Sequence, residues 1–197
     1  MNLDPLLSGV FPVDEAAGAY ASLSGEGRRP LMVVLSYPER EEARARAVRL
    51  GARPGGRAGR MGVALVGAGS FATAVHLPNL AKLGRYFELR AVVSRDGAKA
   101  LAATKRYEAA LASTDLEEAL ADPGVGLVVI ATRHDLHASQ VLAALRAGKN
   151  VFVEKPLALD ADGLAAIEAA CPPDQSGPVL MTGFNRRFSP VMRRAAE

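Results

Sequence analysis

A glycine turn in the first half of the sequence carries its most specific chemistry. Gly67, Gly69 and Ala72 form a G-x-G-x-x-A pattern between an apolar run and a helical pattern. Gly67 permits a tight turn, Gly69 leaves the backbone open to a pyrophosphate, and Ala72 lets the helix pack close to the sheet. The amides at the start of the helix then face the phosphate charge. In this strand–turn–helix context the pattern predicts a dinucleotide-binding turn, which includes Ser70 and Phe71.

The residues at the end of the second expected strand bear on the choice between NAD and NADP. An acid at this position would bind the adenosine ribose 2′-hydroxyl and repel a 2′-phosphate. The sequence has Ser94 and Arg95 instead, a hydroxyl and a planar cationic fork that suit a phosphate. Asp96 is the alternative ribose ligand, and Arg95 has the alternative of being a plain exposed arginine. We therefore expect NADP to be favoured over NAD.

Alternating strands and helices position this turn. Apolar runs that predict strands lie at 61–67, 87–93, 126–131, 150–155 and 178–184. Helical patterns lie between them, at 71–83, 96–107, 116–122, 137–148 and 161–170. Thr114 and Glu117 have capping-box spacing, and Gly148 is a typical residue just after a helix end. Because the strands are apolar throughout, we expect an α/β fold of the Rossmann type, a doubly wound parallel sheet covered on both faces.

Composition limits the class of protein. The 197 residues are 49% hydrophobic and 23% charged, as in a globular domain. No apolar stretch reaches the roughly 18 residues of a membrane helix, and acids rather than bases follow Met1, so we expect neither membrane association nor export. The single cysteine, Cys171, excludes an internal disulfide and a cysteine-based zinc site. The three scattered histidines predict no metal site, and a cytoplasmic location fits.

The net charge of +3 comes from one segment. Residues 39–60 contain seven Arg and three Glu, a balance of +4, so the rest of the chain sums to −1. No aromatic residue interleaves with those arginines, and we therefore expect no nucleic-acid binding. The first part of the segment could form a charged helix, but the Gly-, Pro- and Arg-rich stretch at 51–60 breaks it. The segment is interpreted as a basic linker.

Further motifs extend the pattern beyond the glycine turn. They are V-V-I-A-T at 128–132 followed by His137, A-L-x-A-G-K at 144–149, E-K-P at 154–156 and G-F-N-R-R-F at 183–188. In this order and spacing they resemble the Gfo/Idh/MocA oxidoreductases. The resemblance covers roughly 61–190. It implies an NAD(P)-binding Rossmann domain followed by an α/β substrate domain, and hydride transfer on sugars, polyols or related hydroxyl compounds.

The resemblance also implies roles for individual residues. Lys155 matches the lysine that contacts nicotinamide and substrate, so it is the expected catalytic residue. The expected cofactor-binding residues are Gly67, Gly69, Ser70, Phe71, Ala72, Ser94, Arg95, Ala131, Thr132, Arg133, His137, Glu154, Lys155 and Pro156. Arg133 stands where the family commonly has Pro, which leaves open which side chain of this stretch faces the nicotinamide.

Several of these residues have plainer alternatives. Glu154 and Lys155 could form a surface ion pair of little energetic value. His137 could pack under its helix, and His134 and Asp135 could cap that helix. The arginines at 186, 187, 193 and 194 could bind an anionic substrate or simply form a solvated helix face.

The R-H-D-x-H stretch from Arg133 resembles a branch in which this domain follows a zinc-type medium-chain dehydrogenase. Residues 1–38 hold one expected helix, V-D-E-A-A-G-A-Y-A-S-L, and one expected strand at 31–37, which resemble the end of such a dehydrogenase. The expected division is a remnant at 1–38, the linker at 39–60, the NAD(P)-binding Rossmann domain at 61–183 and the start of a truncated substrate domain at 184–197. One helix and one strand cannot close a core of their own.

The resemblance implies a small-molecule substrate and a homo-oligomer formed through the second domain. Because that domain would supply the other half of the substrate site, we expect this chain to bind cofactor with little or no turnover. The alternative function is a non-catalytic dinucleotide-binding redox sensor or regulatory module, which would have no need of Lys155. A methyltransferase also uses a glycine turn, but it gives no reason for the E-K-P motif.

Overall fold

The computed structural model describes residues 6–24, 31–37, 46–51, 59–172, 174 and 176–196. The chain divides into two compact units, Met1–Arg44 and Ala45–Glu197. Each unit is described by itself.

The first unit is a small strand–helix–strand piece. Strand β1 (Leu7–Pro12) pairs in parallel with β2 (Met32–Ser36), and a 3-10 turn (Val13–Glu15) and helix α1 (Ala16–Ser24) connect them. The expected helix and second strand are confirmed, whereas β1 was not predicted. Among the described residues of this unit only Ala19 is buried. The piece therefore closes no core, as its size predicts, and its resemblance to a medium-chain dehydrogenase stays a prediction.

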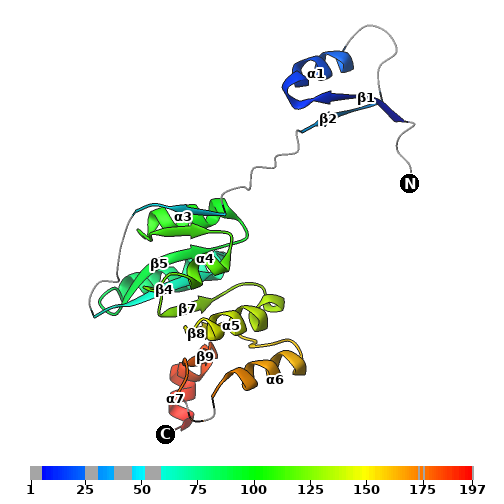
Figure 1. The fold of residues 1–197 in the computed structure, drawn as a ribbon. Helices are drawn as coiled ribbons and strands as arrows, with labels where there is room; N and C mark the ends of the chain where they lie inside the picture. The colour runs from blue at the N-terminus through cyan, green and yellow to red at the C-terminus, as the bar shows by residue number, and fades with distance from the viewer. Residues whose placement is uncertain are drawn as a thin grey trace. The chain divides into compact units, whose positions relative to one another are not determined.

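The second unit is a seven-stranded sheet flanked by helices (Figure 1). Its strands are β3 (Ala47–Arg49), β4 (Met61–Val66), β5 (Phe87–Val93), β6 (Leu111–Ser113), β7 (Leu127–Ile130), β8 (Asn150–Val153) and β9 (Leu180–Thr182). Their order is β3-β6-β5-β4-β7-β8-β9, and every pair except β3–β6 is parallel. Strands β4 to β9 thus have the order of a dinucleotide-binding Rossmann sheet. The predicted fold class is confirmed.

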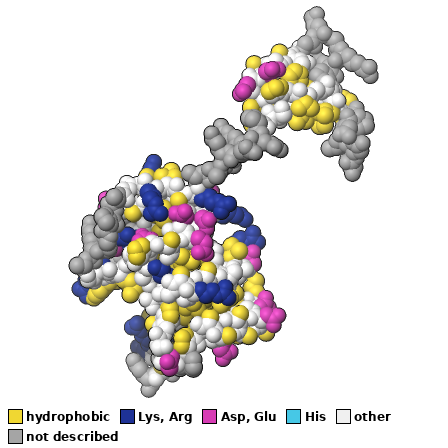
Figure 2. Space-filling view, in the orientation of Figure 1, with side chains coloured by type: hydrophobic (Ala, Val, Ile, Leu, Met, Phe, Trp, Pro, Cys, Tyr) yellow, Lys and Arg dark blue, Asp and Glu magenta, His cyan; other side chains and the backbone are white. Residues whose placement is uncertain are grey.

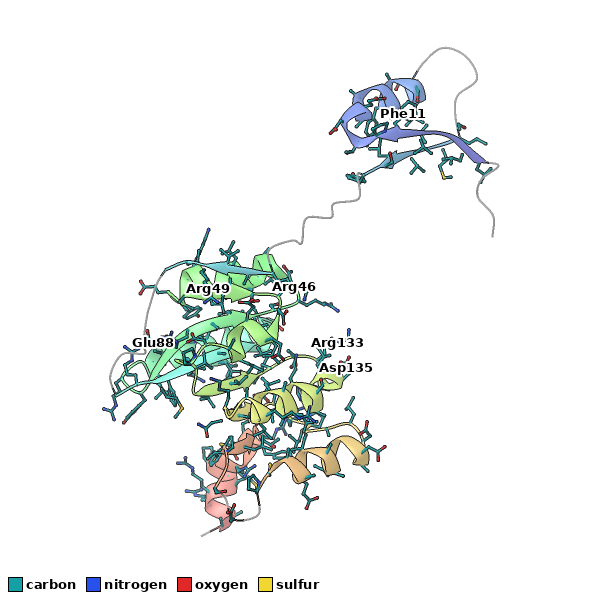
Figure 3. All side chains as sticks on the ribbon, viewed as in Figure 1. Phe11, Arg46, Arg49, Glu88, Arg133 and Asp135 are labelled. Atoms are coloured by element: carbon teal, nitrogen blue, oxygen red, sulfur yellow. The ribbon has the colours of Figure 1, made fainter. Side chains whose placement is uncertain are left out.

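Strand β3 corrects the interpretation of residues 39–60 as a linker. Ala47 pairs with Ser113 in antiparallel register, and the Thr114 amide donates to the Arg46 carbonyl at 2.7 Å. Arg46 and Arg49 also form ion pairs with Asp115 and Glu118 on the neighbouring chain segment (Figure 3). The edge of β6 offers unpaired backbone amides and carbonyls, which can pair with another segment largely independently of its side chains. Residues Ala47–Arg49 therefore form a strand rather than the end of a charged helix. Most of the remaining linker lies outside the described residues.

Helices cover both faces of this sheet. They are α2 (Leu77–Lys82), which continues a π-helical turn (Ala72–His76), α3 (Gly97–Arg106), α4 (Leu116–Leu120), α5 (His137–Arg146) and α6 (Ala161–Ala170). Val63 and Leu65 of β4 pack in the core that includes α2 and α3, whereas Ala64 and Val66 pack in the core that includes α4, α5 and α6. Both faces of the strand are therefore buried, which explains its continuous apolar sequence.

The helix ends agree in part with the sequence patterns. Gly148 follows α5 with φ +70°, as its position at a helix end predicts. Helix α4 begins differently from the expected Thr114 cap, because Asp115 is the N-cap residue and its side chain accepts from the Glu117 amide. Asp96 caps α3 in the same way, by accepting from the amides of residues 98 and 99. The Thr114 hydroxyl instead donates to the Arg46 carbonyl at 3.3 Å, so it does not cap α4.

Charges of both signs occur together on one face of the second unit. Figure 2 shows Lys and Arg side chains mixed with Asp and Glu side chains over the visible face of the second unit. Among the described residues, no helix is long and apolar enough to cross a membrane. In the same part of the chain no three His, Cys, Asp or Glu side chains gather into a group that could hold a metal ion.

Candidate functional site

The candidate site is a cleft at the carboxyl ends of the parallel strands. The strand order reverses at β4, and such a reversal opens a crevice between the neighbouring connections. Two adjoining pockets of about 370 Å³ each lie there. They share Phe71, Ala131 and Thr132 as lining residues, so they are two halves of one cleft. We call them the turn pocket, around Gly67 and Gly69, and the lysine pocket, around Lys155.

The glycine turn has the geometry that its sequence predicts. Gly67 has φ +98°, and a Cβ atom there would lie 2.5 Å from the Ala131 carbonyl oxygen. Its amide donates to the Val93 carbonyl at 2.8 Å, which ties the turn to β5. At Gly69 a Cβ would meet nothing within 4 Å, so the backbone is open. Ala72 is fully buried against the sheet. The turn is therefore fixed by Gly67, while Gly69 leaves room for a ligand.

Polar residues after β5 line the far end of the turn pocket. They are Ser94, Arg95, Asp96 and Lys99, and sequence reasoning missed Lys99. The Asp96 carboxylate is occupied as the cap of α3 and lies 3.5 Å from the Lys99 Nζ. The hydrogen bond from the Lys99 amide, with further help from the Lys99 charge, lowers the pKa of Asp96. The Asp96 carboxylate is thus hydrogen-bonded to the start of α3, whereas Arg95 and Lys99 contribute two cations to the lining of the pocket.

The stretch after β7 serves both pockets. Thr132 donates its hydroxyl to Gln140 Oε1 at 2.7 Å, which holds it at the boundary between the two pockets. Arg133 lines the turn pocket and lies 3.4 Å from Asp135 (Figure 3). His134 lines the lysine pocket. The alternative in which His134 and Asp135 cap helix α5 is wrong: both lie in a 3-10 turn (His134–Leu136), and α5 begins after Leu136 without a side-chain cap.

His137 lies beneath the cleft rather than in it. Its side chain is fully buried, its Nδ1 lies 2.7 Å from the Pro156 carbonyl oxygen, and its Nε2 lies 3.3 Å from the Thr132 carbonyl oxygen. A fully buried ring cannot touch a ligand in the cleft, so its place among the cofactor-binding residues is corrected. The packing alternative fits: His137 joins the segment after β7 to the segment after β8. Pro156 takes part through this carbonyl and lines neither pocket.

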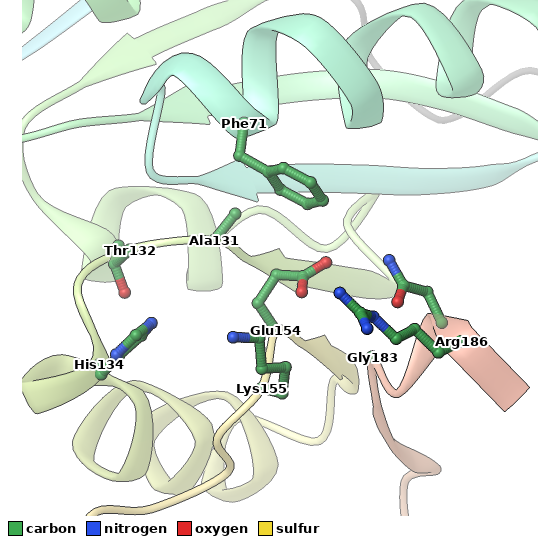
Figure 4. Close-up of a pocket in the computed structure, with 9 residues that line it drawn as sticks. Phe71, Ala131, Thr132, His134, Glu154, Lys155, Gly183 and Arg186 are labelled. Atoms are coloured by element: carbon green, nitrogen blue, oxygen red, sulfur yellow. The ribbon is translucent and has the colours of Figure 1, made fainter.

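The end of β8 places two ionisable side chains in the lysine pocket. Glu154 and Lys155 both line it, with Phe71 and His134 on neighbouring segments (Figure 4). The Glu154 amide donates to the Ile130 carbonyl at 2.9 Å, so the backbone leaves the sheet in a fixed direction. No Glu154–Lys155 ion pair is present among the described residues. The two side chains therefore act separately.

His76 is a site residue that sequence reasoning left without a role. Its Nε2 lies 2.9 Å from Glu154 Oε1, and both side chains are mostly buried, at 15% and 16% exposed. The His76 ring makes edge contacts with Phe71 and Phe152, at centroid distances of 5.3 and 5.6 Å. Because 78 positions separate the two partners in the sequence, no local pattern could reveal this contact.

The segment after β9 closes the lysine pocket. Gly183, Asn185 and Arg186 line it. A Cβ atom at Gly183 would lie 3.3 Å from the Glu154 carboxylate, so a glycine lets the two segments approach. The neighbouring Arg187 instead donates from Nε to the Phe184 carbonyl at 3.1 Å. The two adjacent arginines thus differ: one faces the pocket and the other supports its own turn.

Comparison with known proteins agrees with this geometry. Residues 61–183 match the family model described as an oxidoreductase family with an NAD-binding Rossmann fold, GFO_IDH_MocA. The chain therefore belongs to this oxidoreductase family, and residues 61–183 form its NAD(P)-binding domain. The resemblance inferred from the motifs is confirmed.

Individual relatives support the same family. The chain is 40% identical over 131 residues to 4-carboxy-2-hydroxymuconate-6-semialdehyde dehydrogenase of Sphingobium sp., covering 66% of this chain and 40% of the relative. It is 39% identical over 110 residues to D-xylose 1-dehydrogenase (NADP(+)) 2 of Haloferax volcanii, covering 56% and 33%. The chain thus spans well under half the length of these relatives.

Solved structures with the same fold contain nicotinamide cofactors. GenD2 from gentamicin A biosynthesis, in complex with NAD, is 36% identical with a TM-score of 0.63, covering 74% of this chain and 41% of that one. KijD10, a 3-ketoreductase from Actinomadura kijaniata in complex with NADP, is 28% identical with a TM-score of 0.62, covering 70% and 42%. Both cofactors therefore occur among similar structures.

Proposed function

We propose that this domain binds NADP in preference to NAD and transfers hydride between the nicotinamide and a hydroxyl-bearing sugar, polyol or related compound. One observation carries the proposal: the open backbone at Gly69 and the Lys155 side chain lie in the two halves of one cleft. A dinucleotide that crosses the carboxyl edge of the sheet would pass both.

The turn pocket fits the diphosphate of a dinucleotide. Apart from Gly69 and its two chain neighbours, no described residue has an atom within 4 Å of the position where a Gly69 Cβ would be. The Thr73 amide donates to the Gly69 carbonyl at 3.0 Å, which is the first hydrogen bond of the helix. The backbone amides that precede Thr73 in this first turn have no partner within the helix, so they are available for phosphate oxygens. Ser70 and Phe71 line the same pocket. The chemistry of this donor set suits an anionic diphosphate.

The preference for NADP rests on charge at the end of β5. Arg95 and Lys99 line the pocket, and the nearby acid, Asp96, is engaged at the start of α3. A 2′-phosphate on the adenosine ribose would meet two cations there, and the guanidinium fork matches phosphate oxygens. Ser94 adds a hydroxyl on the same segment. In the alternative in which Asp96 binds a ribose hydroxyl, that hydroxyl would compete with Lys99 for Oδ2, because Oδ1 accepts from the two α3 amides.

We assign the acid–base role to Lys155. The bound nicotinamide supplies the hydride acceptor or donor. Lys155 lies at the carboxyl end of β8 with no hydrogen bond or ion pair to any described residue, so its Nζ is available to a substrate. As the hydride leaves the carbon of a hydroxyl, Nζ takes up the hydroxyl proton, and in the reverse direction it returns that proton. Glu154 is held away by His76.

Relatives support the substrate class. The similar proteins include the D-xylose dehydrogenase above and an inositol 2-dehydrogenase of Corynebacterium glutamicum, which is 33% identical over 129 residues. A pocket lined by Lys155, Asn185 and Arg186 offers several hydrogen-bond donors, which suits a polyhydroxylated compound. The retained Lys155 favours an enzyme over a redox sensor, because dinucleotide binding alone does not require it.

Calorimetric titration of the chain with NADPH and with NADH tests the proposal. We expect tighter binding of NADPH and no binding of either dinucleotide by Gly69→Leu. The Lys155→Met variant should keep its cofactor affinity and lose hydride transfer in the complete protein, whereas a sensor would lose nothing. Absence of heat with both dinucleotides, or unchanged turnover in Lys155→Met, would contradict the proposal.

A further inference from the structure

The lysine pocket has an excess of positive charge. Its ionisable lining residues are Glu154, Lys155, His134 and Arg186. The Glu154 carboxylate is already paired with His76 at 2.9 Å. No described residue forms a hydrogen bond or ion pair with the side chain of Lys155 or Arg186. The pocket therefore presents two cations and one carboxylate, and neither cation is hydrogen-bonded to a described side chain.

Arg186 differs from the arginine beside it. Arg187 donates to the Phe184 carbonyl, and its guanidinium lies 5.5 and 5.8 Å from the ring centroids of Phe184 and Phe188. Arg186 makes no such contact and faces the pocket opposite Lys155 and Glu154 (Figure 4). A guanidinium left free at a pocket wall is suited to a ligand rather than to folding.

We propose that Arg186 binds an oxyanion of the substrate, so that the substrate is a hydroxy compound carrying a carboxylate or a phosphate rather than a neutral polyol. The inference rests on the proposed function, because Lys155 is taken to act on the substrate hydroxyl. Arg186 comes from the segment after β9, whereas Lys155 comes from the end of β8. The two cations can thus hold two different groups of one substrate.

The chemistry of the pocket supports a bound oxyanion. The guanidinium fork of Arg186 matches two oxygens of a carboxylate or phosphate, and the neighbouring Asn185 adds an amide to the same wall. A neutral polyol would leave two cations facing the single Glu154 carboxylate, whereas an oxyanion would balance the second cation.

The test compares charged and neutral probes on the NADP⁺-loaded chain. The probes are D-gluconate, D-glucitol 6-phosphate and D-glucitol, and dissociation constants come from ligand-observed saturation-transfer NMR. We expect at least one charged probe to bind about fivefold or more tightly than D-glucitol, which is the upper end of the strength of one exposed ion pair. The tighter charged probe identifies the oxyanion as carboxylate or phosphate.

Two variants isolate Arg186. Arg186→Gln should abolish the preference, whereas Arg187→Gln, which removes the same charge one residue away, should retain it. Thermal unfolding checks that both variants fold. If Arg187→Gln does not fold, Arg194→Gln in helix α7 (Pro190–Ala196) takes its place as the control.

The outcomes separate this inference from the proposed function. Failure of NADP⁺ to bind in calorimetry would overturn the proposed function. Normal NADP⁺ binding with no preference for a charged probe, with no probe bound, or with an equal loss in both arginine variants would overturn the assignment of Arg186 alone.

Discussion

The His76 Nε2 atom lies 2.9 Å from Glu154 Oε1, which joins the first helix after the glycine turn to the end of β8. These segments flank the two sides of the lysine pocket. The contact fixes the position of the Glu154 carboxylate at the wall of this pocket. His76 is therefore a positioning residue for the lysine pocket.

Replacing His76 by Phe tests this role. Phe preserves edge contacts with Phe71 and Phe152 but removes the hydrogen bond to Glu154. We expect NADPH affinity to fall about fivefold, the value of one hydrogen bond of about 1 kcal/mol. Binding of 2′-phospho-ADP-ribose, which lacks the nicotinamide, should not change. Calorimetry with both ligands makes the comparison, and an equal loss for both would show that His76 acts only through folding.

Two glycines in one turn should respond differently to substitution. Gly67→Ala places a Cβ 2.5 Å from the Ala131 carbonyl at φ +98°, so it should lower the free energy of unfolding by about 2 kcal/mol or more. Gly69→Leu enters open space and should change stability by less than about 0.5 kcal/mol while blocking the dinucleotide. Urea unfolding and calorimetry measure the two effects. A Gly69→Leu protein that binds NADPH normally would contradict the assigned phosphate position.

Charge at the end of β5 should set cofactor choice. Arg95→Asp puts an acid in the turn pocket, so it should weaken NADPH binding by roughly 100-fold and make NADH the tighter ligand, since one charge-assisted bond is replaced by repulsion. Arg146→Gln, at the end of α5, is the matched control because it lines neither pocket. Thermal-shift titrations with both cofactors report the change. An unaltered NADPH-to-NADH ratio in Arg95→Asp would place the 2′-phosphate elsewhere.

A buried ion pair away from the cleft should give the domain a pH-dependent stability. Asp122 accepts from Arg90 Nε at 3.0 Å and from the Gly124 amide at 2.8 Å. Burial acts to raise the pKa of Asp122, but the hydrogen bonds from Arg90 and Gly124 together hold it below its usual value of 3.8. A carboxyl with a lowered pKa stabilises the fold above its unfolded pKa, and this contribution is lost as pH falls through the folded value.

Asp122→Asn isolates that contribution. We expect it to lower the free energy of unfolding by about 3 kcal/mol near neutral pH, because it breaks a mostly buried pair. The difference from the unmodified chain should shrink as the pH falls below 3.8, where the carboxyl of the unmodified chain also becomes protonated. Urea unfolding over this pH range provides the measurement. A difference that stays constant with pH would mean that the carboxylate charge contributes nothing.

The first unit should be dispensable for cofactor binding. Both pockets are lined only by residues of the second unit, Ala45–Glu197. A chain that lacks residues 1–44 should therefore bind NADPH within about twofold of the full chain, as expected for a distant and independent change. Parallel calorimetric titrations compare the two proteins. A large loss of affinity would show that the first unit contributes to the site.

Sequence reasoning identified most of the fold, since the strands from β4 to β9 carry strong local signals. It missed β3, whose three residues lie among arginines, and β1, where Gly9 and Pro12 interrupt the apolar pattern. In the cleft it identified the residues that belong to motifs, such as Gly69 and Lys155. His76 and Lys99 escaped because their significance depends on partners brought close only by the fold, and His137 was misplaced because a motif does not reveal burial.

The antiparallel pairing of β3 with β6 also affects how the domain behaves in concentrated solution. A bare outer strand invites pairing with other molecules, and a short strand with charged neighbours discourages it. Here Arg46 and Arg49 provide that charge and hold β3 in place through Asp115 and Glu118. A version trimmed to residue 61, where the family match begins, would uncover β6 and self-associate, whereas one that starts at residue 45 would retain its protective strand.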